Sequence, residues 1–167
     1  MSKNILLSAM VAAMVGLGAV PKAEAHEGPG GPMGIGIGVG APTGLSLELS
    51  SGWRSSFELA VGFDPFDGVG GYAHLVFKGS LFDFARGSTA IVPLYLGLGM
   101  FAIDQDGFPD DNLDLGVRVP LGVNFDFQRA PVQLFLEGAL LATVVDFGEN
   151  RDGWFGVGGY GGVRLWF

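Results

Sequence analysis

The sequence contains no cysteine, which excludes a disulfide framework, a thiolate metal site and a cysteine nucleophile. Charged residues make up only 16% of the chain, whereas soluble domains usually carry about 25%. Basic residues are scarce, with 9 against 17 acidic residues and a formal net charge of −8. Such a chain repels a phosphate backbone instead of attracting it. These shortages disfavour a cytosolic enzyme and a nucleic-acid-binding protein.

No apolar run is long enough for a transmembrane helix. The longest, residues 5–20, falls short of the roughly 20 residues that span hydrocarbon, so a membrane anchor is the weaker interpretation. Lys3 precedes this run, and the small-x-small sequence Ala23-Glu24-Ala25 follows it. This pattern predicts a signal peptide over residues 1–25 and therefore an exported chain.

Cleavage after Ala25 removes Lys3, Lys22 and Glu24. It leaves 7 basic and 16 acidic residues, a net charge of −9. Residues 26–32, rich in glycine and proline, are predicted to form a flexible lead-in.

What the chain has in abundance is glycine (30 residues), phenylalanine (14) and alternation with period two. From Met33 onward apolar and small or polar residues alternate, and Gly, Pro, Asp and Asn interrupt the pattern. We expect eight strands within residues 33–167, near residues 34–40, 45–50, 56–63, 72–81, 92–101, 113–127, 132–144 and 155–167.

Such alternation is compatible with a soluble β-barrel or with a transmembrane one, and the composition of the polar face distinguishes the two. A soluble lipid-binding barrel would need an outer face rich in Lys, Glu, Thr and Asp. Here that face is mostly Gly, Ser and Ala, whereas the other face is a continuous band of Leu, Val, Ile and Phe. Only closed barrels or helices span hydrocarbon. We therefore predict an all-β, eight-stranded antiparallel up-and-down transmembrane barrel with its polar face inside, and keep the soluble periplasmic barrel as an alternative.

The connecting segments are of two kinds. Those after the second, fourth and sixth strands are short and carry Arg54, Arg86 and Arg129, whereas residues 64–68, 104–112 and 146–153 form longer acidic loops. Outer-membrane barrels have short periplasmic turns and longer external loops, so we expect the acidic loops outside the cell. The strands of the first hairpin are short against the roughly 9–11 residues of a tilted crossing.

Aromatic residues are predicted to form girdles at both rims. Those expected towards the loops are Phe63, Phe66, Phe101, Trp154 and Phe155, and those towards the turns are Phe84, Phe125, Phe127 and Phe167.

The last residues, Val163-x-Leu165-x-Phe167, are similar to the terminal strand signal that the barrel assembly machinery reads. Residues 116–123 (GVRVPLGV) and 132–140 (VQLFLEGAL) resemble a hairpin of uncharacterised small outer-membrane proteins. Over residues 33–167 the chain resembles the small eight-stranded outer-membrane barrels represented by OmpX and the membrane domain of OmpA. The resemblance implies location and architecture and gives no reaction.

Six charged residues are assigned to the lumen by their parity, three of each sign: Glu48, Glu58, Lys78, Arg118, Glu137 and Arg164. An eight-stranded barrel is only wide enough for side chains to fill it. Buried charges are tolerated there as a balanced, hydrogen-bonded network. We expect an internal salt-bridge plug, and a gated ion conduit is the less favoured interpretation.

His74 is the one histidine of the predicted barrel. Small barrels resembling lipid A deacylases or palmitoyltransferases use a histidine with a serine and an acid, so a lipid-modifying enzyme is an alternative function. His74 points inward by parity, however, and Ser80 lies six positions along the same strand face, too far for direct contact. We predict no catalytic residue.

The loop after the fifth strand offers the best metal candidates, Asp104, Asp106, Asp110 and Asp111. Hard cations prefer several carboxylate oxygens, but no glutamate closes a calcium-loop pattern. A GxGxxG string at Gly156 is followed by no helix, so we do not interpret it as a nucleotide site. We expect no cofactor.

The sequence therefore predicts a monomeric outer-membrane barrel with a structural or interaction role. Its expected partners are outer-membrane lipids and, during biogenesis, the assembly machinery.

Overall fold

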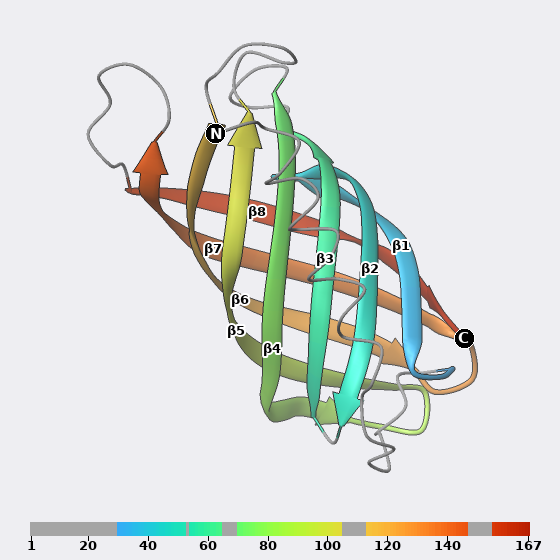
Figure 1. The fold of residues 1–167 in the computed structure, drawn as a ribbon. Helices are drawn as coiled ribbons and strands as arrows, with labels where there is room; N and C mark the ends of the chain where they lie inside the picture. Colours follow the sequence, from blue (N-terminus) through green and yellow to red (C-terminus); the bar gives the residue numbers. More distant parts are fainter. Residues whose placement is uncertain (1–29, 53, 65–69, 105–112, 147–154) are drawn as a thin grey trace.

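The computed structural model describes residues 30–52, 54–64, 70–104, 113–146 and 155–167. They form one closed sheet in which each strand pairs antiparallel with the next and β8 pairs with β1 (Figure 1). The eight strands are β1 Met33–Gly40, β2 Thr43–Gly52, β3 Ser55–Phe63, β4 Gly71–Arg86, β5 Ala90–Asp104, β6 Leu113–Phe127, β7 Val132–Asp146 and β8 Phe155–Trp166. The predicted all-β, eight-stranded up-and-down barrel is confirmed. Within the described part of the chain, no helix is both long and apolar enough to cross a bilayer.

The two ends of the barrel differ in their connections. At one end, here the turn end, the strands are joined by residues 53–54, 87–89 and 128–131. At the other, the loop end, they are joined by the turn Ala41–Pro42 and by residues 64–70, 105–112 and 147–154. The predicted signal peptide, residues 1–25, lies outside the described residues, as do 26–29 of the predicted lead-in.

The strands are staggered around the wall. Successive cross-strand partners lead from Ile35 on β1 through Leu47, Leu59, Leu75, Met100, Val117 and Ala142 to Phe155 on β8. Ile35 itself pairs with Leu165, which is 10 residues further along β8. This offset tilts every strand against the barrel axis, and Figure 1 shows the front strands crossing the rear ones obliquely.

Side chains alternate across the wall as the sequence pattern predicts. Large apolar side chains on the outer face are solvent-exposed, including Ile37 (61%), Leu98 (61%) and Leu136 (62%). The inner face holds the buried polar and charged side chains, among them Arg118 and Arg164 at 0% exposure. The polarity of the barrel is therefore inverted relative to a water-soluble one.

Most of the predicted girdle residues that the structure describes face outward. Phe63, Phe84, Phe125, Phe155 and Phe167 are exposed, and Phe127 is half-buried. Phe66 and Trp154 lie outside the described residues. The prediction is wrong for Phe101, which is 1% exposed and packs inside the barrel. Phe101 has the same parity on β5 as the buried Tyr95 and Ile103. Its side chain therefore faces the lumen, although its aromatic character and its place near the rim are typical of a girdle residue.

Two bulges in β4 reverse its alternation near the turn end. The register against β5 shifts between Ser80 and Phe82 and again between Asp83 and Ala85. Strict alternation would place Phe82 inside. The first bulge turns it outward, where its ring packs edge-on against Phe84 at 5.0 Å.

The same bulges place Asp83 between two arginines. Its side chain is 17% exposed and accepts hydrogen bonds from Arg86 at 2.6 Å and from Arg54 at 3.4 Å. Arg54 sits in the turn after β2 with a φ of 73°. Two of the three predicted turn-end arginines are thus paired with one carboxylate.

Glycines on the inner face make room for bulky side chains. A Cβ on Gly34 would lie 2.9 Å from the indole of Trp166, and one on Gly122 would lie 2.5 Å from the Tyr95 hydroxyl. Real Cβ atoms do not approach so closely. Only glycine therefore fits opposite these aromatic rings.

Candidate functional site

The six charged residues predicted for the lumen come together inside the barrel. All are buried, with exposures of 4% or less: Glu48, Glu58, Lys78, Arg118, Glu137 and Arg164. They come from β2, β3, β4, β6, β7 and β8. Three carboxylates face three cations, so the formal charges balance. We call these six residues the lumen network.

Arg164 of β8 holds the half of the network nearer the turn end. Its Nη1 donates to Glu48 Oε2 at 2.5 Å and to Gln133 Oε1 at 3.0 Å. Its Nη2 pairs with Glu58, and its Nε donates to Ser46 Oγ at 2.8 Å. One guanidinium thus uses all three of its nitrogens across the lumen, with the fork geometry that suits arginine to buried carboxylates.

Arg118 of β6 holds the half nearer the loop end. Its Nη2 donates to Glu137 Oε1 at 2.5 Å. Its Nη1 donates to the Tyr72 hydroxyl at 3.0 Å and to the Ala41 carbonyl at 3.4 Å. The second oxygen of Glu137 accepts a hydrogen bond from Tyr95 at 2.6 Å.

Lys78 joins the two halves. Its Nζ pairs with Glu58 and lies 3.4 Å from Glu48 Oε2 and 3.8 Å from Glu137 Oε2. It also sits 4.6 Å from the centre of the Tyr95 ring. Ser56 completes the set by donating to Glu48 Oε1 at 2.6 Å. A single ammonium group therefore touches all three carboxylates.

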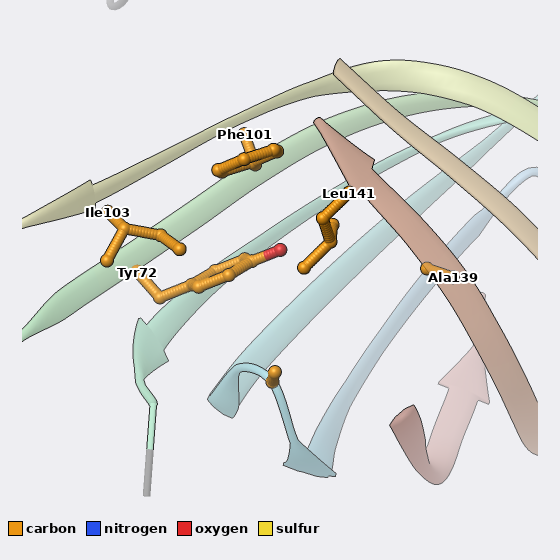
Figure 2. Packing of buried hydrophobic residues seen from close by; sticks show 6 residues of the cluster. Tyr72, Phe101, Ile103, Ala139 and Leu141 are labelled. Carbon is orange, nitrogen blue, oxygen red and sulfur yellow. The ribbon is translucent and has the colours of Figure 1, made fainter. Parts of the chain in front are cut away.

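Aromatic and aliphatic side chains fill the rest of the interior. The Arg164 guanidinium lies 3.8 Å from the centre of the Phe135 ring, a cation–π arrangement. Towards the loop end, an apolar cluster closes the lumen above Arg118, and Figure 2 shows its side chains converging from several strands. Its members are Ala41, Tyr72, Phe101, Ile103, Ala139 and Leu141.

The turn between β1 and β2 takes part in this closure. Ala41 is 4% exposed, and Pro42 is also buried. The Ala41 amide donates to the Gly159 carbonyl at 2.8 Å, and its carbonyl accepts from Arg118. The first hairpin thus ends in a turn that is folded into the barrel mouth and tied to β8 and β6.

His74 is enclosed by aromatic rings. Its exposure is 0%, and its ring stands edge-on to Tyr72 at 5.8 Å and to Tyr160 at 5.6 Å. Among the described residues neither ring nitrogen finds a hydrogen-bond partner, and the nearest carboxylate oxygen, on Glu58, is 3.8 Å from Nε2. A serine nucleophile activated by a histidine requires a hydrogen bond between the two, and the His74 nitrogens make none.

Three of the four predicted metal candidates lie in a part of the chain that the structure does not describe. Asp106, Asp110 and Asp111 lie outside the described residues, and Asp104 is the last residue of β5. Among the described residues, no group of three or more acidic or histidine side chains is arranged to hold a metal ion.

Sequence reasoning identified the charged residues of the network but missed its neutral members. Tyr72, Tyr95, Ser46, Ser56 and Gln133 all hydrogen-bond to it. The available signal was parity, because each lies on the inner face of its strand.

Comparison of the chain with protein-family models, with curated proteins and with solved structures finds no match. The resemblance to OmpX and the OmpA membrane domain therefore stays a prediction.

Proposed function

We propose that this chain is an integral outer-membrane β-barrel with a side-chain-filled lumen and a structural or interaction role, without catalysis. The observation that carries the proposal is the inverted polarity of a closed wall. Apolar side chains cover the outer face, and the six charged residues of the lumen network are buried on the inner face. In hydrocarbon every backbone N–H and C=O must be paired, and a closed sheet achieves this.

The alternative of a soluble lipid-binding barrel needs the opposite distribution. Leu134 and Leu136 would have to line a cavity, but they are 43% and 62% exposed. Their neighbour Glu137, which would have to meet water, is 4% exposed. Exposing such a band to water would favour aggregation over solubility.

The alternative of a lipid-modifying enzyme finds no accessible histidine base among the residues that the structure describes. His74 is sealed from both solvent and the outer face, with no hydrogen-bonded nucleophile. The predicted signal peptide and the terminal residues Val163, Leu165 and Phe167 fit export and barrel assembly. Within that proposal the acidic loops face the exterior, and the chain is a monomer.

Cell fractionation tests the proposal. We expect the mature chain in the outer-membrane fraction, resistant to alkaline extraction, and migrating differently in detergent gels before and after boiling. Recovery of folded mature chain from the periplasm without detergent would contradict membrane insertion. Loss or gain of an acyl chain on radiolabelled lipid A, abolished by His74→Ala, would instead establish the enzyme.

A further inference from the structure

The apolar outer wall differs in height around the barrel. On β1 the outward apolar residues run from Met33 to Val39. At about 3.3 Å per residue and a tilt of about 35–45°, they cover about 15 Å along the axis. On β6 they run from Leu113 to Phe127, which is about 35 Å by the same measure. A transmembrane barrel usually presents a band of about 25 Å.

Polar side chains bound the short part of the wall at both ends. On β2 the outward apolar residues are Leu45, Leu47 and Leu49. Thr43 lies beyond them at the loop end, where its hydroxyl donates to the Gly40 carbonyl at 3.0 Å. At the turn end Ser51 and Ser55 share a hydrogen bond of 3.1 Å between their hydroxyls. On the adjoining β3 the outward apolar residues run only from Phe57 to Phe63. We call β1, β2 and β3 together the short sector.

The short sector is held at this height by the rest of the fold. The turn between β1 and β2 is folded inward and bonded to Gly159 and Arg118, so no loop extends the wall upward at this point. Tilting the whole barrel would move the short sector along the membrane normal, but it would not lengthen it. A bilayer of ordinary thickness must therefore deform beside the short sector, because a hydrophobic surface that is too short is met by thinning.

We propose that the short sector thins the bilayer locally and so speeds the movement of phospholipids between the two leaflets. This activity rests on the proposed membrane insertion and adds a lipid-directed function to it. The route runs along the outside of the wall, because the lumen network and the apolar cluster above it fill the interior.

The test uses the folded mature chain in vesicles of dioleoyl phosphatidylcholine that contain a fluorescent, dithionite-quenchable phosphatidylcholine. Transfer of the probe to the outer leaflet should be about tenfold faster than in protein-free vesicles. The reason is that the free-energy cost of hydrophobic mismatch, which drives the thinning, grows with each ångström of mismatch. In thinner dilauroyl vesicles the acceleration should be smaller. An equal or larger acceleration in the thin bilayer would overturn the proposal.

Two variants separate the short sector from the rest of the wall. Ser51→Leu/Ser55→Leu extends its apolar surface at the turn end and should reduce the acceleration at least about threefold. Gly138→Leu adds an apolar side chain on the tall part of the wall, where a Cβ meets nothing within 4 Å. It should leave the rate unchanged. Equal rates for the wild type and the double serine variant would contradict our assignment.

Failure of insertion and failure of this inference give different results. If the chain does not enter vesicles in a heat-modifiable form, the proposed function fails. If it enters but the probe moves no faster, only the thinning proposal fails. A Val39→Cys variant tests whether a second copy of the chain covers the short sector, since Val39 on β1 is 69% exposed. Efficient formation of disulfide-linked dimers at high lipid excess would also overturn the proposal, because lipid would then not contact β1.

Discussion

Arg118 on β6 and Glu137 on β7 form an ion pair of 2.5 Å inside the barrel, and solvent reaches at most 1% of either side chain. They are partners of different cross-strand pairs, since Arg118 faces Leu141 and Glu137 faces Gly122 along the β6–β7 register. The guanidinium therefore reaches along the lumen to meet the carboxylate. A buried pair of this kind is costly to break from one side.

Arg118→Leu should lower the free energy of unfolding by about 3–5 kcal/mol, because Glu137 keeps its charge without its closest cation. Urea titration of the folded protein in micelles measures this loss. The double variant Arg118→Leu/Glu137→Gln should recover much of the stability, since Gln still accepts the Tyr95 hydrogen bond without a charge. Wild-type stability in the single variant would contradict the structural role of the lumen network.

Gly122→Leu should destabilise the barrel by about 1–3 kcal/mol, the usual cost of overpacking. A side chain at this position meets the Tyr95 ring at 2.6 Å and the Leu136 carbonyl oxygen at 2.6 Å. Gly138→Leu, on the outer face in open space, is the matched control and should change the unfolding midpoint little. Equal effects of the two substitutions would show that the interior is looser than described.

His74→Phe should keep or raise stability by up to about 1 kcal/mol. Phenylalanine preserves the edge contacts with Tyr72 and Tyr160 and removes two buried nitrogens without partners, each of which carries a desolvation cost. His74→Ala should instead cost about 2 kcal/mol or more through lost packing. A strong loss of stability in His74→Phe would reveal a hydrogen bond to the imidazole.

Leu98→Arg tests the outer wall. Leu98 is 61% exposed near the middle of β5, and a cation there should cost about 2–4 kcal/mol if the wall faces the middle of a bilayer. Folding yield and urea stability in phospholipid vesicles measure the effect, with Leu98→Met as the neutral control. An unchanged yield would contradict a lipid-facing wall at this level.

Alternation with period two was sufficient to predict the number of strands and the face on which each charged side chain lies. The alternation predicts whether a side chain faces the lumen or the outside. It does not predict the position of that side chain along the barrel axis, because this position depends on the stagger of the strands. The meeting of Arg164 with Glu48 and Glu58, 116 and 106 residues away along the chain, follows only from that stagger. The alternation also does not say which inward neighbours would complete the hydrogen bonding.

The alternation does not predict two local features, and one residue that obeys it was assigned to the wrong place. The β4 bulges turn Phe82 outward, although strict alternation places it inside. Residues 80–85 contain no glycine or proline that would indicate a bulge in the sequence. Phe101 lies in the interior, as its parity on β5 predicts, and its aromatic character alone had placed it in the girdle. The inward fold of Ala41 and Pro42 depends on Arg118, 77 residues away from Ala41, so the sequence around the turn does not contain the information.

The seam between β1 and β8 affects how this protein must fold. Gly34 pairs with Trp166 there, a contact that joins residues more than a hundred positions apart, and the sheet has no closed wall until that contact forms. Contacts of such long sequence separation make spontaneous folding slow. Until the seam closes, two free strand edges remain open to other chains. The intermediate before closure, and not the finished barrel, is thus the state in which this chain most needs protection from aggregation.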